Sequence, residues 1–288
     1  LKSSAGQVTG VPFVSVIVPI RNEARYIRGC LDSIAQQDYP HKRMEILIAD
    51  GMSTDGTREA VQSYAELDIP THWVDNPGRI VPTGMNLALR QARGDILVRV
   101  DGHCEIAPDY ISNCVKHLQD SDADGVGGSM ETVGETPLSE TIAVAMSSPF
   151  GVGGSAFRTV RAVTMYADTV PFPAYSRGIV ERAGLYDEEL VRNQDDEYNY
   201  RIRELGGKIL LASDVRSRYY SRGSLKKLWK QYFQYGYWKV RVLQKHPRQM
   251  SPRQFVPLLF VVSLFLSSLL AFITGWGGWL LAFVAGSY

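Results

Sequence analysis

The chain has 288 residues and a net charge of +1, a balance that excludes broad nucleic-acid binding, which needs a strongly basic domain. Its three cysteines, Cys30, Cys104 and Cys114, are too few and too scattered for a disulfide framework or a zinc site, so we expect a reducing compartment. The length is sufficient for one large α/β domain with appendages.

Strand and helix patterns alternate along the first hundred residues. Apolar, β-branched runs predict buried strands over residues 14–19, 44–49, 71–74 and 96–100. Helical spacing of apolar residues predicts helices that begin at 21–23, after the loop 50–57, and at 80. This alternation predicts a mostly parallel sheet with helices on both faces.

Polar side chains follow three of these strands. Pro19 to Glu23, Asp50 to Asp55 and Asp101 to His103 each stand where a strand ends. In an open α/β sheet the carboxyl ends of the strands form the edge at which ligands bind, so we expect one crevice there. The alternative for the last segment is a simple turn, with Asp101 capping the next element and His103 solvated.

The middle of the chain is less regular. Between Gly127 and Pro173, glycines and prolines interrupt short apolar pieces, among them the run Gly151-Val152-Gly153-Gly154. We interpret this segment as mobile loops on an acceptor side, or alternatively as a flexible surface excursion. Residues 172–177 would then return the chain toward the crevice.

The carboxyl end has a membrane-like composition. Residues 224–245 interleave aromatic side chains with lysines and arginines, as in helices that lie in the headgroup layer, although a solvated basic helix is the alternative. Residues 256–273 carry no charge and are nearly long enough to cross a bilayer. A second apolar run, 279–284, resembles a truncated span, and nothing at the amino end resembles a signal peptide.

These patterns divide the chain into three expected parts. Residues 11–223 form a catalytic domain, residues 224–252 form interface helices, and residues 253–288 form the transmembrane segments. The excess of positive charge before the apolar run places the catalytic domain on the cytoplasmic side of the inner, cytoplasmic membrane.

Several motifs together resemble a family 2 glycosyltransferase of the GT-A, Rossmann-like fold. The resemblance covers roughly residues 14–220 and is closest to membrane-anchored bacterial exopolysaccharide glucosyltransferases of the succinoglycan type. The motifs that carry it are Val16-Ile17-Val18-Pro19 with Asn22-Glu23, Asp50 with Ser53-Thr54-Asp55-Gly56-Thr57, Asn86 before Ala92-x-Gly94-Asp95, Asp101-x-His103, and Asn193-Gln194-Asp195-Asp196-Glu197 with Arg201.

The resemblance implies a site for a UDP-sugar donor. Asp50 would accept a hydrogen bond from the base, Pro19 would line the base pocket, and Glu23 would reach the nucleoside. Asp101 would face the ribose or a metal ion. The family usually has a second aspartate where this chain has His103, and imidazole moves the preference from Mg²⁺ toward Mn²⁺, so we expect Mn²⁺ or Mg²⁺.

The same resemblance makes Asp195 the general base, with Gln194 in place of the family's glutamate. Its structural alternative is an acidic helix start favoured by the helix dipole. The implied reaction is an inverting transfer of a hexose, glucose in this family variety, to a lipid-linked, polyprenyl-type acceptor at the membrane.

Two alternatives stay open at this stage. A processive polysaccharide synthase typically shows Gln-x-x-Arg-Trp on an interface helix, whereas Gln234-Tyr235-Gly236-Tyr237-Trp238 lacks the arginine. We therefore expect Gln234, Tyr237 and Trp238 to lie at the acceptor and membrane interface of an enzyme that adds one sugar. A non-catalytic scaffold that binds nucleotide sugars would have no need of Asp195.

Overall fold

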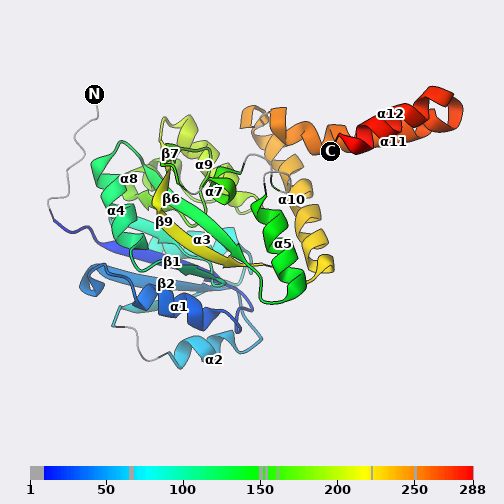
Figure 1. Ribbon diagram of the computed structural model, residues 1–288. Coiled ribbons are helices and arrows are strands. Elements are labelled where there is room, and N and C mark those ends of the chain that lie inside the picture. Colours follow the sequence, from blue (N-terminus) through cyan, green and yellow to red (C-terminus); the bar gives the residue numbers. More distant parts are fainter. Residues whose placement is uncertain are drawn as a thin grey trace. The chain divides into compact units, whose positions relative to one another are not determined.

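The computed structural model describes residues 10–64, 68–148, 152, 155–160, 162–221, 223–249 and 252–287. The chain divides into two compact units, residues 1–242 and 243–288. The first unit is built on a nine-stranded sheet with the order β3-β2-β1-β4-β8-β6-β9-β5, in which β7 also pairs with β9 (Figure 1). The strands are β1 Val14–Ile20, β2 Met44–Asp50, β3 Thr71–Asp75, β4 Ile96–Arg99, β5 Cys104–Ile106, β6 Gly125–Val133, β7 Met165–Tyr166, β8 Ala174–Ser176 and β9 Ile209–Tyr220.

The sheet is parallel over its first half and mixed over its second half. Strands β3, β2, β1 and β4 are parallel neighbours, as the alternating pattern predicts. Beyond them, β8 is antiparallel to both β4 and β6, and β5 is antiparallel to β9, whereas β6 and β9 are parallel. The expected α/β fold is therefore confirmed, with a mixed extension on one side.

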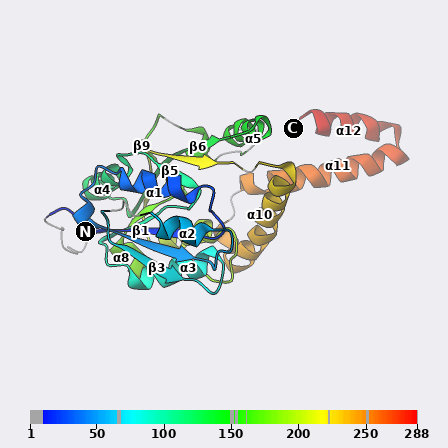
Figure 2. The same ribbon diagram turned by 90° about the horizontal axis from the view of Figure 1, so that it is seen from below.

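Helices cover both faces of this sheet (Figure 2). Side chains alternate along β1, so Val16 joins a core with α1 and α4, while Ile17 joins a second core with α3, α8 and α9. The helices of the first unit are α1 Ile27–Ala35, α2 Thr57–Gln62, α3 Val81–Gln91, α4 Tyr110–Asp120, α5 Pro137–Ser147, α7 Ala156–Thr159, α8 Arg177–Ala183, α9 Gln194–Glu204 and most of α10 Leu225–Lys245, with the 3-10 turn η1 His41–Arg43.

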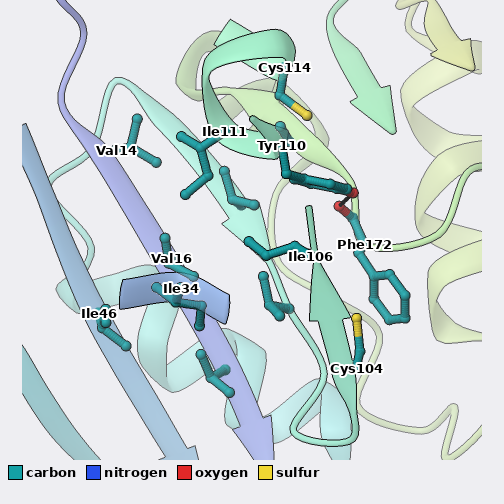
Figure 3. Packing of buried hydrophobic residues seen from close by; sticks show 14 of the residues in the cluster. Val14, Val16, Ile34, Ile46, Cys104, Ile106, Tyr110, Ile111, Cys114 and Phe172 are labelled. Atoms are coloured by element: carbon teal, nitrogen blue, oxygen red, sulfur yellow. Dashed lines mark hydrogen bonds between the residues drawn. The ribbon is translucent and has the colours of Figure 1, made fainter. Parts of the chain in front are cut away.

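In the core on the α1 and α4 face, one buried side chain links helix α4 to the loop before β8. Tyr110 is fully buried, and its hydroxyl donates a hydrogen bond to the Phe172 carbonyl oxygen at 2.7 Å (Figure 3). This bond satisfies a buried polar atom and fixes the chain that leads into β8.

Two predicted elements differ from those observed. Helix α1 begins at Ile27 instead of residues 21–23. Asn22 has a left-handed φ of 57°, and its segment forms hydrogen bonds with the loop after β2 in place of a helical turn. Residues 125–147 are more regular than expected, since β6 and α5 lie there. Gly128 fits this strand because a Cβ would come 1.6 Å from the Val215 carbonyl oxygen, so the glycine permits close strand packing, and does not mark a loop. Of the predicted run 151–154, only Val152 lies within the described residues.

The second unit consists of two apolar helices after the short 3-10 turns η2 Pro247–Gln249 and η3 Pro252–Phe255: α11 Val256–Ile273 and α12 Gly275–Gly286. Helix α11 is long and apolar enough to cross a membrane, and large side chains such as Leu259, Val261 and Phe265 are exposed on it. In water this surface would be costly, since apolar area favours burial.

Helix α10 exposes a second kind of surface. Leu225, Trp229, Phe233, Tyr237 and Val240 recur about every four residues and are all more than half exposed. Exposed lysines at 226, 227 and 230 accompany them. An apolar stripe flanked by cations is typical of a helix that lies on an anionic lipid surface.

We expect the two segments to bind lipid by different forces. The full chain should float with vesicles even in about 1 M salt, because apolar burial is not screened, whereas a chain ending at Lys245 should bind only anionic vesicles and be released by salt. Vesicle flotation measures both. Salt-resistant binding of the shortened chain would show that α11 is not the anchor.

Candidate active site

Two loops at the carboxyl edge of the sheet are joined to each other by hydrogen bonds from backbone amides to side-chain oxygens. The amide of Asn22 donates to Ser53 Oγ at 2.9 Å, and the amide of Thr54 donates to Asn22 Oδ1 at 2.9 Å. The amide of Glu23 donates to Thr57 Oγ1 at 2.8 Å. These bonds give Ser53 and Thr57 a structural role and hold both loops as one rigid frame for the crevice.

Asp50 stands at the base of this frame. Its side chain is fully buried and accepts hydrogen bonds from Ser53 Oγ at 2.5 Å and from Arg58 Nε at 2.6 Å. Arg58 also pairs with Asp75 at the end of the neighbouring strand. The Asp50 carboxylate is therefore held in place from within the chain, and a base would reach only its remaining acceptor capacity.

Asp101 is held by an arginine from the end of its own strand. Arg99 is 7% exposed and donates two hydrogen bonds to the carboxylate, from Nε to Oδ1 at 2.7 Å and from Nη2 to Oδ2 at 3.1 Å. Burial alone would raise the pKa of Asp101, but the charge and hydrogen bonds of Arg99 outweigh it and lower the pKa. Asp101 is thus an oriented carboxylate that stays ionised.

His103 is oriented by a carboxylate from the first loop. Its Nδ1 lies 3.0 Å from Glu23 Oε1, and both side chains are mostly buried. The ring also meets the edge of Tyr219, with centroids 5.0 Å apart. A carboxylate that accepts from Nδ1–H leaves the lone pair on Nε2, the arrangement found behind histidine metal ligands. The structure therefore brings Glu23, Asp101 and His103 together, as predicted.

The three acids at the start of α9 have different partners. Asp196 forms an ion pair with Lys239 of α10, and Glu197, 2% exposed, binds Arg201 through two hydrogen bonds of 2.6 and 3.1 Å. Asp195 instead accepts from its neighbour's amide at 3.0 Å and has no ion pair within 4 Å in the described parts of the chain.

Asp195 lies close to the donor motif. Its charge acts on Arg99, the same guanidinium that holds Asp101, and on the buried hydroxyls of Tyr175 and Tyr186. Burial, with Asp195 as a lesser contributor, raises the pKa of both tyrosines. An acid at a helix start that forms no ion pair in the described residues and acts on the guanidinium holding Asp101 is a candidate to accept a proton.

Helix α10 contacts the segment just before Asp195. Gln234 Oε1 accepts from Arg192 Nε at 3.3 Å, and the Tyr235 carbonyl oxygen accepts from the Asn193 side chain at 3.0 Å. Tyr237 is exposed and packs edge-on against Trp238. Gln234 therefore lies at the rim of the site, while Tyr237 points away from the domain.

Two basic residues of the site were missed by sequence reasoning. Arg99 could have been suspected, since a lone arginine in an apolar strand two residues before Asp101 needs a partner. Arg192 carried no signal, because only the fold brings it close enough to act electrostatically on Asp101. Its Nη atoms form no hydrogen bond or ion pair within the described residues.

The sequence matches a known family. The model of Glycosyl transferase family 2 matches residues 15–181, more than half of the chain. Among curated proteins, the succinoglycan biosynthesis protein ExoA of Rhizobium meliloti (strain 1021) is 33% identical over 233 residues, which cover 80% of this chain and 70% of ExoA.

A second curated relative comes from Methanococcus voltae. This dolichyl N-acetyl-alpha-D-glucosaminyl phosphate 3-beta-D-2,3-diacetamido-2,3-dideoxy-beta-D-glucuronosyltransferase is 30% identical over 245 residues, covering 81% of this chain and 74% of the relative.

Solved structures show the same fold. The mannosyltransferase PcManGT from Pyrobaculum calidifontis, in complex with GDP-Man and Mn²⁺, superposes with a TM-score of 0.65 at 26% identity, over 96% of this chain and 74% of its own. Staphylococcus aureus TarS 1-349 in complex with UDP-GlcNAc superposes with a TM-score of 0.54 at 23% identity, over 73% and 59%, and supports the fold alone.

The different partners of the α9 acids predict different losses of stability. Glu197→Gln should lower the free energy of unfolding by about 3 kcal/mol, because it leaves the Arg201 charge unpaired in a mostly buried site. Asp195→Asn should cost less than about 1 kcal/mol, because it breaks no ion pair. Urea unfolding of both variants tests this contrast, and equal losses would show that Asp195 too is held structurally.

Proposed function

Because the chain belongs to glycosyltransferase family 2, we propose that it transfers a hexose, glucose in the first instance, from a UDP-sugar to a lipid-linked, polyprenyl-type acceptor with inversion at the anomeric carbon. The observation that carries the proposal is the placement of Asp195. It is the one acid of the α9 start without an ion pair in the described residues, and its charge acts on the guanidinium that holds Asp101.

The donor would lie across the frame of the two joined loops. Pro19 and Asp50 would contact the base. Glu23 would reach the nucleoside and orient His103, and Asp101 would face the ribose or the metal ion. PcManGT was solved with GDP-Man and TarS with UDP-GlcNAc, so the fold accommodates either base; our choice of uridine rests on Asp50. Our choice of glucose rests on the resemblance of the motifs to exopolysaccharide glucosyltransferases of the succinoglycan type.

The residues present fit a divalent ion. Asp101 and His103 would hold the ion. In the described part of the chain no group of three or more histidine, cysteine or acidic side chains gathers, so the diphosphate oxygens would supply further ligands. A bound ion supplies positive charge to the leaving diphosphate. The imidazole donor, oriented by Glu23, favours Mn²⁺ over Mg²⁺.

The chain's own side chains would do the rest. Asp195 would take the proton from the acceptor hydroxyl as its oxygen attacks the anomeric carbon, from the face opposite the diphosphate. Arg192, held by Gln234 and acting on Asp101, would donate its Nη groups to the diphosphate.

The acceptor would approach along α10. Its exposed aromatic and basic stripe would lie on the cytoplasmic face of the membrane, with Tyr237 and Trp238 at the lipid boundary and α11 as the anchor. This arrangement divides the chain into a catalytic domain (11–223), interface helices (224–252) and a membrane segment (253–288).

The proposal is tested with a panel of nucleotide sugars. Release of nucleoside diphosphate is measured with membrane lipid extract as acceptor, and the anomeric configuration of the product is read by NMR. We expect UDP-glucose to be turned over fastest and the configuration to invert. Release that does not depend on the lipid extract, or retention of configuration, would contradict the acceptor class or the mechanism.

The metal requirement should depend on His103. In His103→Ala, Mn²⁺ should no longer strengthen UDP binding. In Glu23→Gln the Mn²⁺ concentration for half-maximal binding should rise about 10- to 100-fold, because a metal ligand loses its orienting carboxylate. Calorimetric titration of UDP at several Mn²⁺ and Mg²⁺ concentrations measures both. An undiminished Mn²⁺ effect in His103→Ala would remove His103 from the ligand set.

The base assignment has a matched control in the same helix. Asp195→Asn should slow transfer by about 10²- to 10⁴-fold while leaving the UDP dissociation constant nearly unchanged, because positioned proton transfer acts in the chemical step. Asp196→Asn removes the same charge one residue along and should act mainly through its contact with Lys239, with a milder loss. The reverse ranking would identify Asp196 as the base.

A further inference from the structure

Arg158 is a cation without an acidic partner. It lies on α7, partly buried, where Nη1 donates to Thr132 Oγ1 at 3.0 Å and the guanidinium packs over the Phe157 ring. The ionisable groups around it are the hydroxyls of Tyr219, Tyr232 and Tyr235, and burial lowers its pKa. It forms no salt bridge with any acid in the described parts of the chain.

Several other arginines of this domain have acidic partners. Arg99 is paired with Asp101, Arg201 with Glu197, and Arg58 with both Asp50 and Asp75. A partly desolvated charge without a counterion is costly, so a protein keeps one chiefly where a ligand supplies the opposite charge. The fork of Arg158 uses one donor for Thr132 and has others left, which suits the oxygens of a phosphate.

The position of Arg158 relates it to the candidate active site. Thr132 and Tyr219 are paired in register across β6 and β9, and the Tyr219 ring touches His103. On the other side, Tyr235 belongs to the α10 turn that binds Asn193, two residues before Asp195. Arg158 therefore lies between the Asp-x-His turn and the interface helix.

We propose that Arg158, with Thr132 and the neighbouring tyrosine hydroxyls, forms a phosphate-binding site on the α10 side of Asp195. The inference rests on the proposed function for the nature of the phosphate. One source is the phosphate of the lipid-linked acceptor, which would enter beneath α10, and the other is the diphosphate of the donor. Both present the same oxygens to the guanidinium, and binding experiments separate them.

The test uses the full chain in detergent, with farnesyl phosphate as the lipid probe, farnesol as its uncharged counterpart, and UDP as the donor probe. Arg158→Gln should weaken farnesyl phosphate binding by about tenfold or more, as expected for loss of a charge-assisted hydrogen bond, and leave farnesol unchanged. Arg90→Gln, which removes an exposed arginine on α3, is the matched control and should change neither.

The outcomes separate the sources. Weakened farnesyl phosphate with unchanged UDP binding assigns the site to the acceptor, and weakened UDP with unchanged farnesyl phosphate assigns it to the donor. Unchanged binding of both overturns the proposal. UDP binding by the unaltered chain tests the proposed function on its own, so the two failures are distinguishable.

Stability gives a second readout. If Arg158 is kept for a ligand, Arg158→Gln should unfold at the same temperature as the unaltered chain or above it, because an unpaired charge has been removed. A clearly lower unfolding temperature, not restored in Arg158→Lys, would show that Arg158 serves the fold and would overturn the proposal.

Discussion

The guanidinium of Arg99 is buried where β4 leaves the sheet, and its charge has to be balanced there. Asp101 balances it through two hydrogen bonds, and Asp195 adds a second negative charge from α9. A buried pair of this kind contributes little net stability, but removing one partner is expensive. The Arg99–Asp101 pair therefore specifies geometry. It fixes the turn that carries His103, and the charge of Asp195 links this turn electrostatically to the start of α9.

Helix α10 extends this organisation toward the membrane. Its contacts with Arg192, Asn193 and Asp196 all fall within the few residues around Asp195. A helix whose outer face suits a lipid surface thus also supports the segment that presents the proposed base. In the proposed function, movement of α10 on a membrane would therefore reach the segment that carries Asp195.

The loop after β1 and the loop after Asp50 show how residues of a family motif can have a structural role. The hydroxyls of Ser53 and Thr57 accept hydrogen bonds from the neighbouring loop, and Arg58 forms ion pairs with Asp50 and Asp75 at the ends of two parallel strands. The result is a frame in which Glu23 is held by its backbone while its carboxylate reaches His103. Preorganisation of this kind lowers the cost of fixing a ligand.

Local features of this protein can be recognised in its amino-acid sequence. Apolar runs located β1, β2 and β4 and the carboxyl edge that joins Glu23, Asp50, Asp101 and His103, because side-chain periodicity and strand ends are local properties. A run of eighteen uncharged, apolar residues located α11, since such a run is recognised from its composition and length alone.

Pairings between segments far apart in the chain become visible only in the fold. The mixed half of the sheet, the use of Gly128 in a strand, and the partners of Arg99, Arg192 and Arg158 depend on contacts that no local pattern encodes. The distinction between Asp195 and its neighbours has the same origin. Three adjacent acids look alike in sequence. They differ in the fold because Lys239 and Arg201 form ion pairs with two of them, whereas the third acts electrostatically on Arg99.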